Sequence, residues 1–223
     1  MSKCEVGEVI RTSDGKDVLI LARTGLHRTV QVVGEEHLGT YLVHKYNLVH
    51  KQPISPLSPT VLKIGCLGVG EFTKDHEEYD VWEKLLKEYG DRLCADWRNY
   101  NKFAKWFYRA KQYSSHYKIA PVNTTDDEEL GPWNTFYIPT FFIGLMTGRV
   151  KGRSVPQGII SGRKWQVREI GSGRIAGSFT TKEAAIDCWI ETRNAEMQKW
   201  AEEYRYMMPP EAYNALIQWR ARF

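Results

Sequence analysis

The sequence lacks two features that would each have narrowed its class at once. Its four cysteines lie far apart and form no CxxC pair, which argues against a zinc knuckle or a disulfide framework and predicts a reducing compartment. It contains no run of about 18 apolar residues, and its first residues form no apolar signal region. We therefore expect an intracellular protein without a membrane span.

Charge and composition leave several classes open. The net charge is only +4 over 223 residues, so the distribution of charge is more informative than its total. Hydrophobic residues make up 42% of the chain and aromatic residues 13%, which is enough for a packed core and excludes wholesale disorder. The length allows one large domain or a few small ones.

The N-terminal part predicts a small β module over residues 1–52. Three short β-prone runs are separated by turn signals; they are Val9-Ile10, residues 18–21 and residues 29–33. A connector is expected over 53–74, because three prolines between residues 53 and 59 favour an extended backbone. The glycines at 65, 68 and 70 follow it, and their spacing predicts a tight turn rather than a phosphate loop.

Two aromatic helices are expected between residues 75 and 113. Apolar side chains recur at three- and four-residue intervals in both, and Gly90 is expected to end the first. The stripes are Tyr79, Trp82, Leu85, Leu86 and Tyr89, then Trp97, Tyr100, Phe103, Ala104 and Phe107. We interpret both as core packing. From Arg92 to Lys118 there are seven bases and one acid, which suits a polyanion but also an ordinary solvated face.

The C-terminal part predicts a three-stranded sheet followed by a long helix over 156–223, after a basic linker at 148–155. Thr180 or Thr181 is expected to cap the helix. The side chains expected on its sheet-facing side are Ala185, Cys188, Trp189, Thr192, Ala195, Met197 and Trp200. Strand alternation places Trp165 and Val167 on one face and Arg168 on the other, which favours Trp165 as a core residue.

The central part resembles a group of bacteriophage HNH endonuclease-like proteins, which include homing endonucleases. The motifs that carry the resemblance are Tyr79-x-x-Trp82, Cys94-x-x-Trp97-x-x-Tyr100-x-x-Phe103-x-x-Trp106 and Phe136-x-Ile138-Pro139. The resemblance implies a helical and ββα-metal core over 75–147. In such a core a histidine deprotonates water, and an oxygen ligand holds a divalent metal that stabilises the leaving group.

The metal-binding positions of that family are not kept. His116 matches its histidine, but Lys118 and Ala120 stand where it has aspartates, and Ile143 stands near its asparagine. An ammonium and a methyl group cannot hold Mg²⁺. We therefore expect no metal and no cofactor. The remaining candidate ligands are Asp126 and Asp127 in the acidic loop, and Mg²⁺ would be used only if the core cuts, with His116 as the catalytic residue.

The C-terminal part resembles the plant ethylene-response-factor (APETALA-like) type of DNA-binding domain. The resemblance rests on Trp165 within a strand and on the Gly177-to-Ala185 segment at the helix entry. In that family the sheet lies in the major groove and uses its arginines and tryptophan. The matching positions are Arg163, Lys164, Trp165, Arg168 and Arg174. The basic linker adds Arg149, Lys151 and Arg153 as DNA contacts.

Together these features predict an α+β protein with a small N-terminal β module, a nuclease-like core and a C-terminal sheet-plus-helix domain. The expected function is phage-encoded binding of double-stranded DNA without nuclease activity, in the cytoplasm of the infected bacterial host. Two alternatives stay open. One is an active metal-dependent HNH homing or accessory endonuclease. The other is a non-enzymatic phage protein that binds a host enzyme or a virion component.

Overall fold

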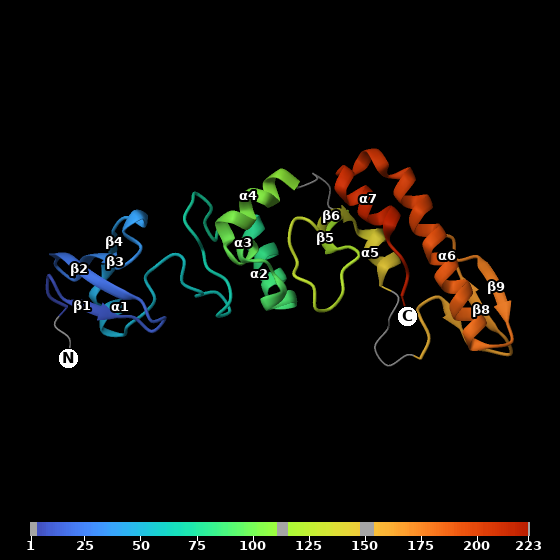
Figure 1. The fold of residues 1–223 in the computed structure, drawn as a ribbon, viewed down its shortest axis with the longest axis horizontal. Coiled ribbons are helices and arrows are strands. Elements are labelled where there is room, and N and C mark those ends of the chain that lie inside the picture. The colour runs from blue at the N-terminus through green and yellow to red at the C-terminus, as the bar shows by residue number, and fades with distance from the viewer. Residues whose placement is uncertain (1–3, 111–115, 148–153, 223) are drawn as a thin grey trace. The chain divides into compact units, whose positions relative to one another are not determined.

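A computed structural model describes residues 4–110, 116–147 and 154–222, which fold as the predicted α+β protein (Figure 1). The chain divides into two compact units, residues 1–107 and 108–223. This boundary falls inside the expected 75–147 core. The aromatic helices therefore belong to the first unit, and the segment that follows them belongs to the second.

Unit 1 begins with a four-stranded antiparallel sheet in chain order. Its strands are β1 (Val9–Arg11), β2 (Asp17–Thr24), β3 (His27–Val32) and β4 (Tyr41–His44), and the short helix α1 (Lys45–Val49) follows. The first three strands match the predicted runs, whereas β4 and α1 were not predicted. Alternate residues such as Val18 and Ile20 are buried. Arg28 is buried among them, and its Nε donates to the carbonyl oxygen of Cys4 at 2.7 Å.

The proline-rich segment is bonded to this sheet module instead of forming a free tether. Ser55 and Ser58 are both buried. The Ser55 hydroxyl donates to Glu35 at 2.5 Å, and the Ser58 hydroxyl donates to Asp14. Burial opposes ionisation of Asp14, but the hydrogen bonds from Ser58 and Thr12 outweigh it, so the pKa of Asp14 is lowered. The segment has irregular backbone, as expected, but its serine hydrogen bonds hold it against the sheet module.

The glycine cluster forms the predicted turn and packs closely on the following helices. Gly68 has φ of +73°, a conformation that favours glycine. A Cβ on Gly70 would lie 2.7 Å from Cγ of Asn101. The Asn101 side chain fixes the turn, because its Nδ2 donates to the Leu67 carbonyl at 2.8 Å and its Oδ1 accepts from the Phe72 amide at 3.0 Å.

The aromatic segment folds into three helices where two were expected. They are α2 (Glu77–Tyr89), α3 (Ala95–Arg98) and α4 (Tyr100–Ala110), with a 3-10 turn (η2, Gly90–Arg92) after α2. Gly90 ends α2 as predicted, and Asn99 has an extended ψ of 113° that separates α3 from α4. The second stripe is fully buried. Glu78 is also buried, which was not predicted, and it accepts a hydrogen bond from the Tyr100 hydroxyl at 2.9 Å.

Unit 2 contains a hairpin, a helix, a sheet and two further helices. The hairpin pairs β5 (Tyr117–Pro121) with β6 (Thr135–Pro139), and α5 (Thr140–Met146) follows directly. The antiparallel sheet consists of β7 (Ile159–Ile160), β8 (Trp165–Arg168) and β9 (Ile175–Phe179). The long helix α6 (Lys182–Glu203) and the final helix α7 (Pro210–Gln218) complete it. Thr181 caps α6, as one of the two expected caps, by accepting from the Ala184 amide at 3.3 Å.

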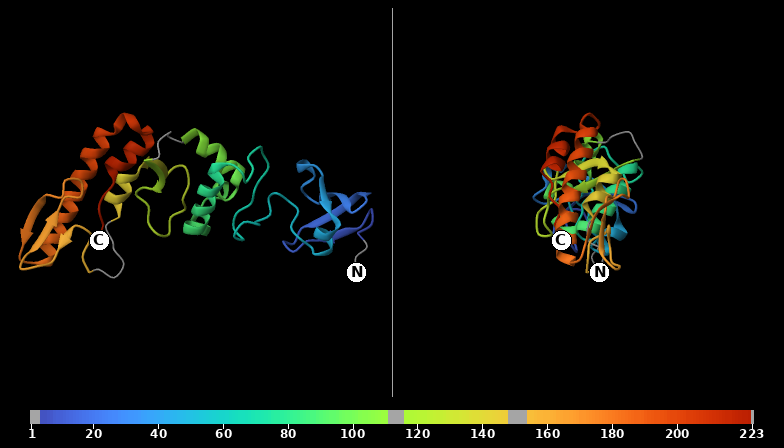
Figure 2. Two further views of the ribbon diagram at one scale, coloured as in Figure 1. Left: turned by 180° about the vertical axis from the view of Figure 1, so that it is seen from behind. Right: turned by 90° about the vertical axis from the view of Figure 1, so that its right-hand side faces the viewer.

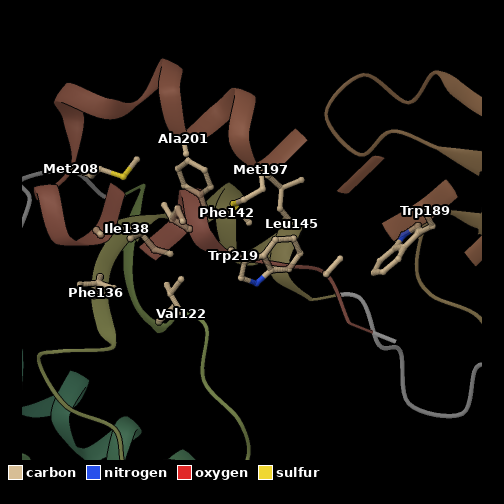
Figure 3. Packing of buried hydrophobic residues seen from close by; sticks show 14 of the residues in the cluster. Val122, Phe136, Ile138, Phe142, Leu145, Trp189, Met197, Ala201, Met208 and Trp219 are labelled. Atoms are coloured by element: carbon tan, nitrogen blue, oxygen red, sulfur yellow. The ribbon is translucent and has the colours of Figure 1, made fainter. Parts of the chain in front are cut away.

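One buried cluster joins all of these elements. It includes Ile138 from the hairpin, Phe142 from α5, Val167 from the sheet, Met197 from α6 and Leu216 from α7, and many of its members face one another in Figure 3. Figure 2 shows α6 lying along the sheet. The hairpin and the C-terminal sheet therefore share a core, although a linker at 148–155 was expected to separate two domains.

Among the residues that the structure describes, no helix combines the length and the apolar character needed to cross a membrane.

We predict that Gly70→Ala lowers the free energy of unfolding of unit 1 by about 1–3 kcal/mol, because the new Cβ collides with Asn101. The matched control is Gly144→Ala in α5, where a Cβ meets no atom within 4 Å and helix propensity favours alanine by about 0.5–1 kcal/mol. Urea unfolding of both variants checks this. A Gly70→Ala protein as stable as the parent would contradict the packing described.

Candidate nucleic-acid interface

The two faces of the C-terminal sheet differ in character, as strand alternation predicted. Val167 is fully buried, and Trp165 is half-buried and packs against the same cluster. Trp165 lies opposite Phe179, and Val167 opposite Gly177, on the strand that precedes α6. Trp165 thus lies on the face of β8 that packs against the core, opposite the face that carries Arg168.

The outer side of the sheet and its turns carry the predicted cations. Arg163, Lys164, Arg168 and Arg174 are all exposed. Alternation along β8 places Arg168 on the face opposite the buried Val167, whereas Arg174 lies in the turn between β8 and β9, beside α6. None of the four forms an ion pair with a carboxylate in the part of the chain that the structure describes. Their positive charge is therefore available to a partner. Three further predicted contacts, Arg149, Lys151 and Arg153, lie outside the described residues.

The exposed surface of α6 has the opposite charge. It carries one exposed base, Lys199, and five exposed acids, which are Glu183, Asp187, Glu191, Glu202 and Glu203. The sheet-plus-helix part therefore has a basic side and an acidic side. Such a separation orients the protein in the field of a polyanion, with the sheet towards it.

Arg193 is a buried cation that the pattern analysis missed. Arg193 is only 1% exposed. Its Nη2 donates to the Gln157 carbonyl oxygen at 3.3 Å, and its guanidinium lies 5.2 Å from the centroid of the Trp189 ring. Burial lowers the pKa of Arg193, and Glu196, 3.7 Å away, opposes that shift. The expected inward residue Ala195 is exposed instead. Arg193 lies four residues from both Trp189 and Met197, so a strict four-residue spacing would have predicted that it is buried.

The hairpin places the nuclease-like positions on a ββα arrangement. His116 is exposed just before β5, and its carbonyl oxygen accepts from the Thr140 amide at 2.7 Å. Lys118 pairs with Ile138 and is exposed, whereas Ala120 pairs with Phe136 and is only 5% exposed. Ile143 is half-buried on α5 and packs against the core cluster. None of Lys118, Ala120 and Ile143 has a side chain that could bind a metal.

The acidic loop between β5 and β6 is organised by local hydrogen bonds. The Thr125 hydroxyl donates to Asp127 at 2.6 Å, and the Thr125 amide donates to Glu128 at 3.2 Å. Trp133 lies near the end of this loop and is 57% exposed. Over the described ranges, no three histidine, cysteine, aspartate or glutamate side chains lie close enough together to hold a metal ion. Within these ranges, Asp126 and Asp127 therefore have no third histidine, cysteine or carboxylate beside them to complete a metal site.

No protein-family model, curated protein or solved structure matches this chain. Its function is therefore inferred from its residues and their geometry.

We predict that Trp165→Ala and Arg168→Ala, on opposite faces of β8, have different effects on the free energy of unfolding. Trp165→Ala should lower the free energy of unfolding of unit 2 by about 2–3 kcal/mol, because it leaves a cavity against the core. Arg168→Ala should change it by less than about 0.5 kcal/mol, because the side chain is exposed and has no carboxylate partner among the described residues. Denaturant unfolding followed by circular dichroism measures both. Equal losses in the two variants would rule out this assignment of faces.

Proposed function

We propose that this protein is a phage-encoded double-stranded-DNA-binding protein built on an HNH-endonuclease-like scaffold that does not cut. It acts in the cytoplasm of the infected bacterial host. The observation that carries the proposal is a set of exposed cations on the C-terminal sheet and its turns, which have no carboxylate partner among the described residues; they are Arg163, Lys164, Arg168 and Arg174.

The physical basis of binding is the neutralisation of backbone phosphates. Each cation that contacts a phosphate releases condensed counterions, and this release supplies much of the affinity. An exposed arginine can also bind the edge of a guanine with two hydrogen bonds. The acids on α6 disfavour the opposite orientation, so the charge pattern supports a mode in which the sheet meets the duplex.

The hairpin supports a scaffold role rather than a catalytic one. The order of β5, β6 and α5 agrees with the ββα arrangement that the resemblance implies. The ligand positions do not agree with a metal site, since Lys118 repels a cation and Ala120 lies in the core. His116 alone would have no metal beside it to stabilise the departing oxygen.

We predict that the protein binds a duplex of about 20 base pairs and that the affinity falls steeply between about 50 and 200 mM salt. Arg168→Gln should weaken binding and reduce the steepness of the salt dependence by about one phosphate contact. Lys84→Gln, an exposed change in α2 of unit 1, is the control and should have no effect. Fluorescence anisotropy measures both quantities. Absence of binding at low salt would refute the proposal.

A separate prediction concerns cutting. Supercoiled plasmid incubated with Mg²⁺ or Mn²⁺ should stay intact with the parent protein and with His116→Ala, because no oxygen ligands accompany His116 at the matching positions. Agarose electrophoresis reports nicking. Metal-dependent nicking by the parent that disappears in His116→Ala would replace this proposal with the active endonuclease.

A further inference from the structure

A cleft in unit 2 lies between α6 and the turn that joins β8 to β9, on both sides of Trp200. One side has a volume of about 580 Å³, and its lining combines apolar surface with polar side chains, among them Ser172, Arg174 and Lys199. The other has a volume of about 400 Å³ and is mostly apolar. Both are lined by Gly171 and Trp200. The two hollows thus adjoin. The larger hollow, which carries the charged side chains, is called the polar end, and the smaller hollow is called the apolar end.

The apolar end is built from aromatic rings. Phe141 from α5 lies 5.7 Å from the Trp200 ring and 4.8 Å from the Tyr204 ring, measured between centroids. All three side chains are half-buried. Gly171 forms the shared wall, and a Cβ there would approach Trp200 to 3.3 Å. Aromatic rings arranged in this way favour contact with another planar ring.

The acids at the polar end are already engaged. Glu196 accepts from the Ile170 amide at 3.2 Å and from the Gly171 amide at 3.0 Å, and Arg193 lies 3.7 Å from it. Glu169 accepts a hydrogen bond from the Ser172 hydroxyl. These carboxylates hold the turn against α6, so they are not free to bind a cationic ligand.

The cations at the same end are not engaged by carboxylates. Arg174 and Lys199 are both exposed, and neither has an ion-pair partner among the residues that the structure describes. Lys199 Nζ lies 5.4 Å from the Trp200 ring centroid, which holds the ammonium beside the aromatic end. The cleft thus holds two cations without a carboxylate partner in the described part of the chain, beside the negative charges of Glu169 and Glu196.

We propose that the cleft binds a nucleotide, with the base against the rings around Trp200 and the phosphate at Lys199 and Arg174. A planar ring joined to an anionic group matches both ends, and the two hollows together have the size of small-molecule sites in proteins. This inference goes beyond duplex binding by the sheet. Arg174 belongs to both surfaces, whereas Lys199 belongs to the cleft alone, so Lys199 is the residue on which the test rests.

The test is calorimetric titration of the full-length protein with dAMP, deoxyadenosine and inorganic phosphate. We expect dAMP to bind more tightly than either of the others, because only dAMP reaches both ends. Lys199→Gln should weaken dAMP binding about fivefold, the size of one exposed charge contact, and leave deoxyadenosine binding unchanged. A short single-stranded oligonucleotide in the same titration shows whether the preferred source is a free nucleotide or a base within a strand.

Two further variants keep the result interpretable. Trp200→Leu should abolish dAMP binding; since Trp200 also packs against the core, its fold is checked by circular dichroism. Arg168→Gln, on the outer face of the sheet, should leave dAMP binding intact while it weakens duplex binding. A failure of duplex binding would therefore not affect this proposal.

Three outcomes would overturn the nucleotide site. The first is no saturable binding of dAMP up to millimolar concentration. The second is equal affinity for dAMP and deoxyadenosine, which would remove the role of the cations. The third is equal affinity for dAMP and inorganic phosphate, which would remove the role of the rings.

Discussion

Burial of one side of α6 is the interaction on which unit 2 depends. The residues of α6 that face inward pack against the sheet through Trp189 and against α5 through Trp200 and Tyr204. α7 also packs against α6, and the chain after α7 is fixed where the Ala221 amide donates to Asn194 at 2.8 Å. Because hairpin and sheet share this core, a ligand held on the sheet also fixes the position of the hairpin.

The local features of the fold could be predicted from the sequence. Gly90 ends α2, Thr181 caps α6, and the stripe from Trp97 to Phe107 is buried. Each of these three features is determined by residues close to it in the sequence and by the period of the helix. Ala195 and Arg193 show the limit of such patterns. Ala195 was expected to face inward and is exposed, whereas Arg193, for which no prediction was made, is buried beside Gln157 and Trp189.

The non-local features could not be predicted. Ser55 and Ser58 lie in the proline-rich stretch that predicts an extended connector, and only the folded chain brings them to Glu35 and Asp14. The cleft at Trp200 likewise combines α5, the turn at 169–174 and the second half of α6. The cations of the sheet were easier to find, because they cluster in the sequence itself. What the sequence could not show was that no carboxylate engages them in the described part of the chain.

The burial of Ala120 limits which substitutions this position could accept during evolution. Under the proposed nuclease ancestry, a carboxylate once stood at this position. Ala120 now lies in the apolar cluster of unit 2, and an unpaired carboxylate placed there would cost several kcal/mol. A single reverse substitution would thus endanger the shared core before it restored a ligand. Under that proposal, a return of a ligand at this position would require the surrounding packing to change first.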